Sequence, residues 1–166
     1  MDLSKWMLDD FNNIEKSGVA EIFAGKTIVI TGATGYIGSW LLRFFLEYNK
    51  KRTEKNQCNI IALVRNKGKL LDILGNKSCT CFKIVEHDFS KEEDIVISQP
   101  VDYIIHTAAV TTSKDMITYP VETIKTTVLG TEKILNFAKN KKCKGMVYLS
   151  SMEVYGEVEG ENEHRY

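Results

Sequence analysis

The sequence has little that would mark a membrane protein or a nucleic-acid-binding protein. Its 22 Lys and Arg balance 22 Asp and Glu, and the mixed charges give no basic surface for a nucleic-acid backbone or an anionic membrane. No apolar run approaches the roughly 20 residues of a membrane span, and charged residues interrupt every apolar run near the start. Only two prolines are present, so no proline-rich linker divides the chain. We therefore expect one cytoplasmic domain without nucleic-acid or membrane partners.

Cysteine is also scarce. The four cysteines, at positions 58, 79, 81 and 143, are too scattered for a disulfide framework or a zinc site. Cys79 and Cys81 are near neighbours, but their spacing is shorter than that of the usual zinc or redox pair. We interpret all four as small, semi-buried thiols of a reducing compartment, and we predict no metal site.

Strand-like and helix-like segments alternate from residue 26 onward. Short apolar, β-branched runs of the kind buried on both faces of a parallel sheet occupy 27–31, 59–64, 82–86, 103–107 and 146–150. Apolar residues at helical spacing mark helices at about 36–48 and 120–140. This alternation predicts an α/β fold with a doubly wound parallel sheet, whose ligands bind at the carboxyl ends of the strands.

Residues 1–24 precede this alternation as an amphipathic extension. Leu3, Trp6, Phe11 and Ile14 recur at a spacing that predicts one or two helices. We expect this extension to pack on its own domain, with a dimer contact as the alternative. The remainder, 25–166, forms the main domain.

The stretch TGATGYIG, residues 31–38, joins the first predicted strand to the helix that follows. Gly32 permits a tight turn, Gly35 lets backbone amides approach a phosphate closely, and Gly38 lets the helix pack on the strand. The start of the helix adds N–H groups and the positive end of its dipole. A tight turn without a ligand is the alternative. The residues predicted to bind a dinucleotide here are Gly32, Thr34, Gly35, Tyr36, Ile37 and Gly38.

The TGxxGxxG spacing resembles the short-chain dehydrogenase/reductase superfamily, and TGATGYIGSWLL resembles its extended branch. A second stretch, MVYLSSMEVYG at 146–156, resembles the sugar-nucleotide epimerases, dehydratases and decarboxylases of that branch. The resemblance implies a Rossmann-like NAD(P)-binding domain over 25–166, incomplete at its carboxyl end. It further implies a nucleotide-sugar substrate, a transient 4-keto sugar and a homodimer.

The later strand ends supply the other residues that the resemblance assigns to the cofactor. Arg65 and Asn66 follow the second strand; Arg65 favours the 2′-phosphate of NADP, whereas Asn66 suits a ribose hydroxyl, so NAD and NADP both stay open. Thr127 stands where the family commonly has an asparagine near the nicotinamide. We expect His87 and His106 to be structural. The family positions beside the adenine ring and along the cofactor correspond to Asp88, Phe89, Ala108 and Ala109.

Ser151 matches the catalytic Ser or Thr of the family, where a hydroxyl can hydrogen-bond a substrate oxygen as charge develops. Glu153 is a candidate second acid or base. Met152 replaces the aspartate typical of dehydratases, which favours an epimerase or a decarboxylase. Neither Tyr155 nor Tyr166 belongs to the family's catalytic YxxxK motif, so we expect part of a longer enzyme that shows no turnover alone. The alternatives are an NADPH-dependent carbonyl reductase of the same superfamily and a non-catalytic dinucleotide-binding module.

Overall fold

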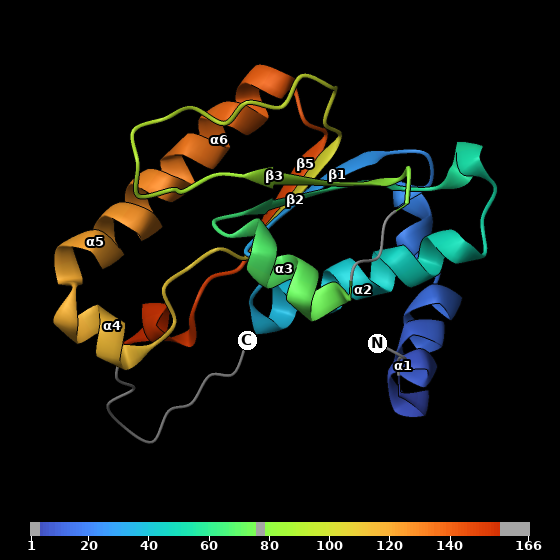
Figure 1. Cartoon of the computed structure of the whole chain (residues 1–166), viewed down its shortest axis with the longest axis horizontal. Coiled ribbons are helices and arrows are strands. Elements are labelled where there is room, and N and C mark those ends of the chain that lie inside the picture. Colours follow the sequence, from blue (N-terminus) through green and yellow to red (C-terminus); the bar gives the residue numbers. More distant parts are fainter. Residues whose placement is uncertain (1–3, 76–78, 157–166) are drawn as a thin grey trace.

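The computed structural model describes residues 4–75 and 79–156, except for the side chains of 152 and 153. Its centre is a five-stranded parallel sheet in the order β3-β2-β1-β4-β5, with helices on both faces (Figure 1). The predicted doubly wound α/β fold is therefore confirmed. The strands are β1 (Thr27–Thr31), β2 (Asn59–Val64), β3 (Phe82–Glu86), β4 (Tyr103–His106) and β5 (Gly145–Tyr148).

The first three strands begin and end at the predicted residues, whereas the last two differ slightly. β4 ends at His106 rather than Thr107, because the Thr107 N–H turns to the side chain of Thr31 instead of continuing a strand ladder. β5 begins at Gly145 and ends at Tyr148, so residues 149–150 already belong to the connection that follows.

The helices are short apart from α1, α2 and α6. The predicted single helix over 120–140 is wrong in one respect, because a π-helical turn, η3, separates α5 from α6. This turn contains three β-branched residues in succession, which crowd a regular helix, and the Thr131 hydroxyl donates to the Thr127 carbonyl at 2.6 Å. The helical segments are α1 (Lys5–Lys16), η1 (Val19–Phe23), α2 (Tyr36–Lys50), η2 (Glu54–Asn56), α3 (Lys67–Leu74), α4 (Ser113–Thr118), α5 (Pro120–Ile124), η3 (Lys125–Leu129), α6 (Gly130–Lys141) and η4 (Met152–Tyr155).

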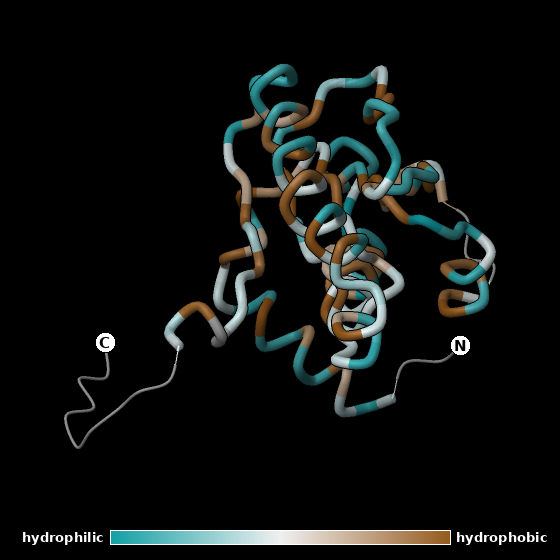
Figure 2. Tube along the Cα trace, turned by 90° about the vertical axis from the view of Figure 1, so that its left-hand side faces the viewer, coloured by the Kyte–Doolittle hydropathy of each residue, from teal (hydrophilic) through white to brown (hydrophobic). Residues whose placement is uncertain are grey.

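The core has two layers, one on each face of the sheet. Ile28 and Ile30 face α2 and α3, whereas Val29 between them faces α6. All three side chains are fully buried, as expected of a strand covered on both faces. Figure 2 shows the apolar segments running through the middle of the molecule, between more polar outer loops.

The helix α1 packs along α2. Trp6 and Phe11 contact Trp40, with ring centroids 5.3 and 5.9 Å apart. Towards the other end of α2, the Glu15 carboxylate accepts from Lys51 at 2.7 Å and from Arg52 at 2.9 Å. These hydrogen bonds hold the pKa of Glu15 below its ordinary value.

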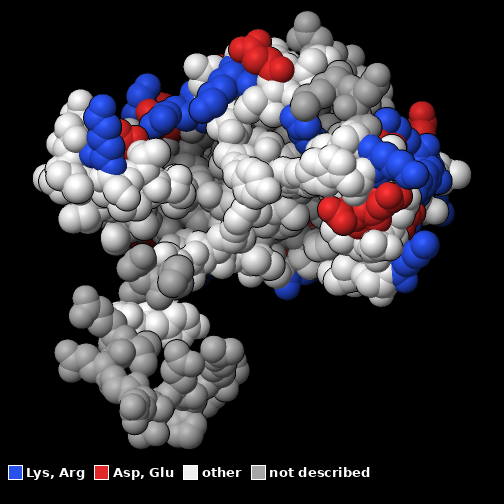
Figure 3. Space-filling view, turned by 90° about the horizontal axis from the view of Figure 1, so that it is seen from below, with Lys and Arg blue, Asp and Glu red and all other residues white. Residues whose placement is uncertain are grey.

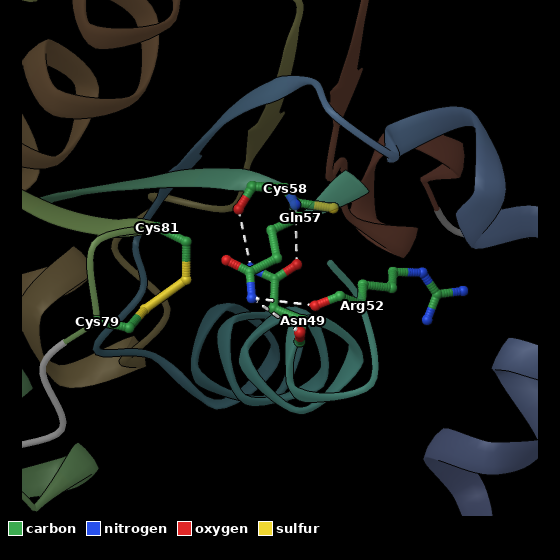
Figure 4. Close-up of a disulfide and its surroundings, with 6 residues drawn as sticks. All are labelled: Asn49, Arg52, Gln57, Cys58, Cys79 and Cys81. Carbon is green, nitrogen blue, oxygen red and sulfur yellow. Dashed lines mark hydrogen bonds between the residues drawn. A yellow bond between two sulfur atoms is a disulfide. The ribbon is translucent and has the colours of Figure 1, made fainter. Parts of the chain in front are cut away.

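Cys79 and Cys81 form a disulfide just before β3 (Figure 4). The two cysteines lie in a turn in which the Phe82 N–H donates to the Cys79 carbonyl. The Cα atoms of Cys79 and Cys81 are 5.3 Å apart, which is within the range of disulfides. The prediction of four free thiols is therefore wrong for this pair. Cys58 is a buried thiol, and its burial raises its pKa to about 11.

Figure 4 also shows how a buried amide joins the end of α2 to the start of β2. The Asn49 side chain is 2% exposed; it donates to the Cys58 carbonyl at 2.9 Å and accepts from the Cys58 N–H at 2.8 Å. One side chain therefore satisfies both backbone groups of Cys58.

The surface seen from below in Figure 3 carries Lys and Arg beside Asp and Glu, with a broad uncharged area between the charged groups. In the described part of the chain, no helix is both long enough and apolar enough to cross a membrane.

Candidate nucleotide site

The order of the strands reverses between β1 and β4, so the carboxyl ends of these two strands form the topological switch point of the sheet. Thr31, the last residue of β1, lies opposite His106, the last residue of β4. The Thr31 Oγ1 accepts from the backbone N–H groups of Thr107 and Ala108 at 3.2 and 3.1 Å, and it lies 2.7 Å from His106 Nδ1. The Thr107 hydroxyl in turn donates to the Thr31 carbonyl at 2.7 Å. These bonds fix the chain that leaves β4 against the end of β1.

The hydrogen bonds of Thr31 determine the tautomer of His106. Because Thr31 Oγ1 already accepts from two amides, its own proton is the one that points to His106 Nδ1. Nδ1 is therefore the acceptor, and the ring proton lies on Nε2. Burial lowers the pKa of His106 to about 4. The ring stacks on Tyr148 and meets the edge of Phe89, so His106 is a neutral packing residue beneath the site.

Two of the three motif glycines are needed because the chain packs against itself. Gly32 has φ of 65°, and a Cβ there would lie 2.7 Å from the Ala108 nitrogen and 2.8 Å from the Thr107 hydroxyl. A Cβ on Gly38 would overlap the Gly32 backbone. Side chains at these two positions would separate α2 from the switch point.

The third glycine, Gly35, is the N-cap of α2, and its N–H donates to the Gly32 carbonyl at 2.8 Å. Within the described residues, no side chain caps this helix. The N–H groups of its first turn lack intrahelical acceptors, and the side chains of Tyr36 and Ile37 are 80% and 50% exposed. An uncapped helix start beside a bare glycine can accept an anion through these N–H groups and the helix dipole.

The predicted adenosine residues lie at the ends of β2 and β3. Arg65 is exposed and Asp88 half-buried. Burial raises the pKa of Asp88, but hydrogen bonds from Ser90 and the charge of Arg65 outweigh it and hold that pKa below its ordinary value. The Asn66 Oδ1 accepts from the Lys69 N–H at 2.9 Å and so caps α3, which leaves its amide nitrogen to approach a ribose. Phe89 is 8% exposed and offers little of its ring to a ligand.

The remaining predicted residues follow β4 and β5. Ala108 is half-buried and Ala109 exposed, directly after the switch point. Thr127 lies in the π-helical turn, half-buried. Ser151 follows β5, which pairs with β4, and its carbonyl accepts from the Val154 N–H at 3.3 Å. The backbone of Glu153 belongs to η4, whereas its side chain lies outside the described residues.

The structure thus brings the glycine turn and residues 107–108 into direct contact. Arg65, Asn66, Asp88 and Phe89 follow the ends of β2 and β3, whereas Thr127 lies in the π-helical turn and Ser151 and Glu153 lie in the segment after β5. Thr31 and Thr107 are the residues that sequence reasoning missed. The signal was a hydroxyl at the last position of a buried strand, immediately before the first glycine. Within residues 4–75 and 79–156, no group of three or more His, Cys, Asp or Glu could hold a metal ion.

Comparisons with known proteins identify the family and the fold. The model of the "NAD dependent epimerase/dehydratase family" matches residues 28–165. UDP-glucose 4-epimerase of Rickettsia prowazekii is 33% identical over 131 residues, which are 78% of this chain and 38% of that protein. dTDP-D-glucose 4,6-dehydratase of Dictyostelium discoideum is 30% identical over 142 residues, 82% of this chain and 31% of that protein.

A solved structure also shares the fold. DesIV, a dTDP-glucose 4,6-dehydratase from Streptomyces venezuelae crystallised with NAD and TYD, superposes with a TM-score of 0.63 at 23% identity. The match covers 81% of this chain and 42% of that one. The chain therefore spans less than half the length of the proteins that it resembles.

Proposed function

Because the chain belongs to the NAD-dependent epimerase/dehydratase family, we propose that it is the cofactor-binding part of an enzyme that modifies a nucleotide sugar. The observation that carries this proposal is the position of the uncapped start of α2, at the switch point between β1 and β4. Gly32 and Gly38 bring the turn close to Thr107, so the amides of the turn stand at the edge where ligands of such sheets bind.

The residues present fit a dinucleotide. The amides of Tyr36 and Ile37 would hold the pyrophosphate, since Gly35 leaves the approach free of a side chain. Arg65, Asn66 and Asp88 would hold the adenosine side, and Ala108, Ala109 and Thr127 would border the nicotinamide side. When bound, NAD supplies a hydride acceptor and donor.

The substrate-facing residues of this chain would be Ser151 and Glu153. The Ser151 hydroxyl, in the segment that follows β5, would donate to the sugar oxygen that becomes a carbonyl, and so stabilise the transient 4-keto sugar. Glu153 would move a proton in the second step, an epimerisation or a decarboxylation. The base that removes the first proton would come from a YxxxK motif in the longer enzyme, so the chain alone is proposed to bind and not to turn over.

A second candidate rests on Arg65. The loop after β2 carries this exposed guanidinium, with Lys67 and Lys69 close behind it in sequence. A guanidinium pairs well with a 2′-phosphate. An NADPH-dependent reductase would therefore bind NADPH much more tightly than NADH, and titrating both cofactors into the same protein separates the two functions.

The proposed function is tested by calorimetric titration of NADH into the wild-type chain and into Gly35→Asp. The wild type should bind, and the new carboxylate should abolish binding because it places a negative charge where the pyrophosphate belongs. Asn59→Asp is the matched control, since it adds the same charge at the exposed start of β2, at the opposite end of the sheet. Absence of heat with both NADH and NADPH in the wild type would refute the proposal.

A further inference from the structure

A chain of aromatic rings connects α1 with the start of α2. Tyr36 is the first residue of α2, and its ring lies 6.2 Å from that of Trp40, one helical turn further on. Trp40 in turn contacts Trp6 and Phe11 of α1, at 5.3 and 5.9 Å between ring centroids. The first residue of the phosphate-facing turn is thus linked to the N-terminal helix through one tryptophan.

The turn that Tyr36 begins has little support of its own. Gly35 offers no side-chain cap, and the first turn of α2 contains no acidic residue that would favour the positive end of the helix dipole. Gly38, which belongs to this first turn, is a poor helix former. The contact of the Tyr36 ring with Trp40 therefore contributes more to the stability of this first turn than it would at a helix start with a Ser or Asp cap.

The family model begins to match at residue 28, so α1 lies outside the matched residues. We propose that α1 is a positioning element of the nucleotide site and that Trp6 is its positioning residue. Trp6 packs on Trp40, which supports Tyr36 and keeps the amides of Tyr36 and Ile37 directed at a pyrophosphate. This inference rests on the proposed function, since the ligand is the dinucleotide.

The other contacts of α1 provide a matched control. Glu15 pairs with Lys51 and Arg52 at the carboxyl end of α2, far along the helix from Tyr36. Glu15→Gln weakens the attachment of α1 without touching the aromatic chain. Trp6 is 59% exposed, so its replacement leaves the core of the domain intact.

The test is calorimetric titration of NADH into the full chain and its variants. Trp6→Ala should weaken binding about three- to tenfold, the range of one aromatic pair contact, whereas Trp6→Phe should stay within about twofold of the wild type because a ring remains. Glu15→Gln should bind as the wild type does. Once Tyr36 is replaced by alanine, Trp6→Ala should add no further loss, because the two residues act in series.

Four results would overturn the inference. Equal affinity of Trp6→Ala and the wild type would show that α1 does not position the site. Equal weakening by Glu15→Gln and Trp6→Ala, or additive losses in the double variant, would show that α1 acts only through general packing. A wild type that binds neither NADH nor NADPH would remove the proposed function as well, which distinguishes that failure from the other three.

Discussion

Replacing Thr31 by valine tests the contacts that hold the switch point together. Valine keeps the shape of threonine but removes the hydroxyl that accepts from the amides of Thr107 and Ala108 and donates to His106. Thr31 is fully buried and His106 is 2% exposed, so the imidazole nitrogen loses its partner where water cannot replace it. The two amides are partly buried and can turn towards water at a smaller cost.

The expected loss follows from these groups. A buried polar atom left without a partner costs about 1–3 kcal/mol, and each of the two amides adds roughly 0.5–1 kcal/mol, so Thr31→Val should lower the free energy of unfolding by about 2–5 kcal/mol. Thr31→Ser keeps the hydroxyl and loses one buried methyl group, which should cost about 1 kcal/mol. Urea denaturation followed by tryptophan fluorescence measures both values, provided that the slope with urea is unchanged. Equal losses in the two variants would refute the role of the hydroxyl.

Three further predictions concern stability. The pKa of His106 falls from 6.5 to about 4 on folding, so below pH 6.5 the unfolded chain binds more protons than the folded one. The free energy of unfolding should therefore fall by roughly 1.5 kcal/mol between pH 6.5 and 5, measured from urea midpoints. An equal fall with pH in His106→Asn would contradict this prediction. Gly38→Ala should cost about 1–3 kcal/mol through overpacking, measured as a lower thermal midpoint, whereas Gly145→Ala, whose Cβ would meet only Tyr103 at 3.5 Å, should change little. Asn49→Ala removes the side chain that pairs with both backbone groups of Cys58, and it should lower the free energy of unfolding by about 2–4 kcal/mol. The control Asn59→Ala, at an exposed position, should lower it by less than about 0.5 kcal/mol. Similar urea midpoints for the two variants would contradict the role of the Asn49 amide.

The strands could be predicted because each is a short apolar run bounded by polar residues or glycine. β1, buried on both faces, has the uninterrupted apolar composition that such burial demands. The interruption at Lys125–Leu129 could not be predicted from periodicity, because apolar residues continue at helical spacing through it. The Cys79–Cys81 bond depends on a local turn that the spacing alone does not specify.

The candidate site was predictable where one short stretch carries it and not where distant residues meet. The spacing of the glycines predicts the turn. The hydrogen bond between Thr31 and His106 could not be predicted in this way, because it joins residues 75 positions apart. The aromatic chain from Trp6 to Tyr36 likewise depends on how α1 lies against α2. In the sequence the apolar stripe of α1 indicates only that one face is buried, and it does not identify the surface that covers it.

The amide signals of the first turn of α2 give the most direct test of the account. A 1H–15N NMR titration of the isotope-labelled chain with NADH reports on each backbone N–H separately. We predict that the largest saturable shifts belong to Gly35, Tyr36 and Ile37, with smaller ones at Ala108 and Asp88. Shifts confined to residues away from the carboxyl ends of the strands, or no shifts at all, would contradict the assignment of this turn as the nucleotide site.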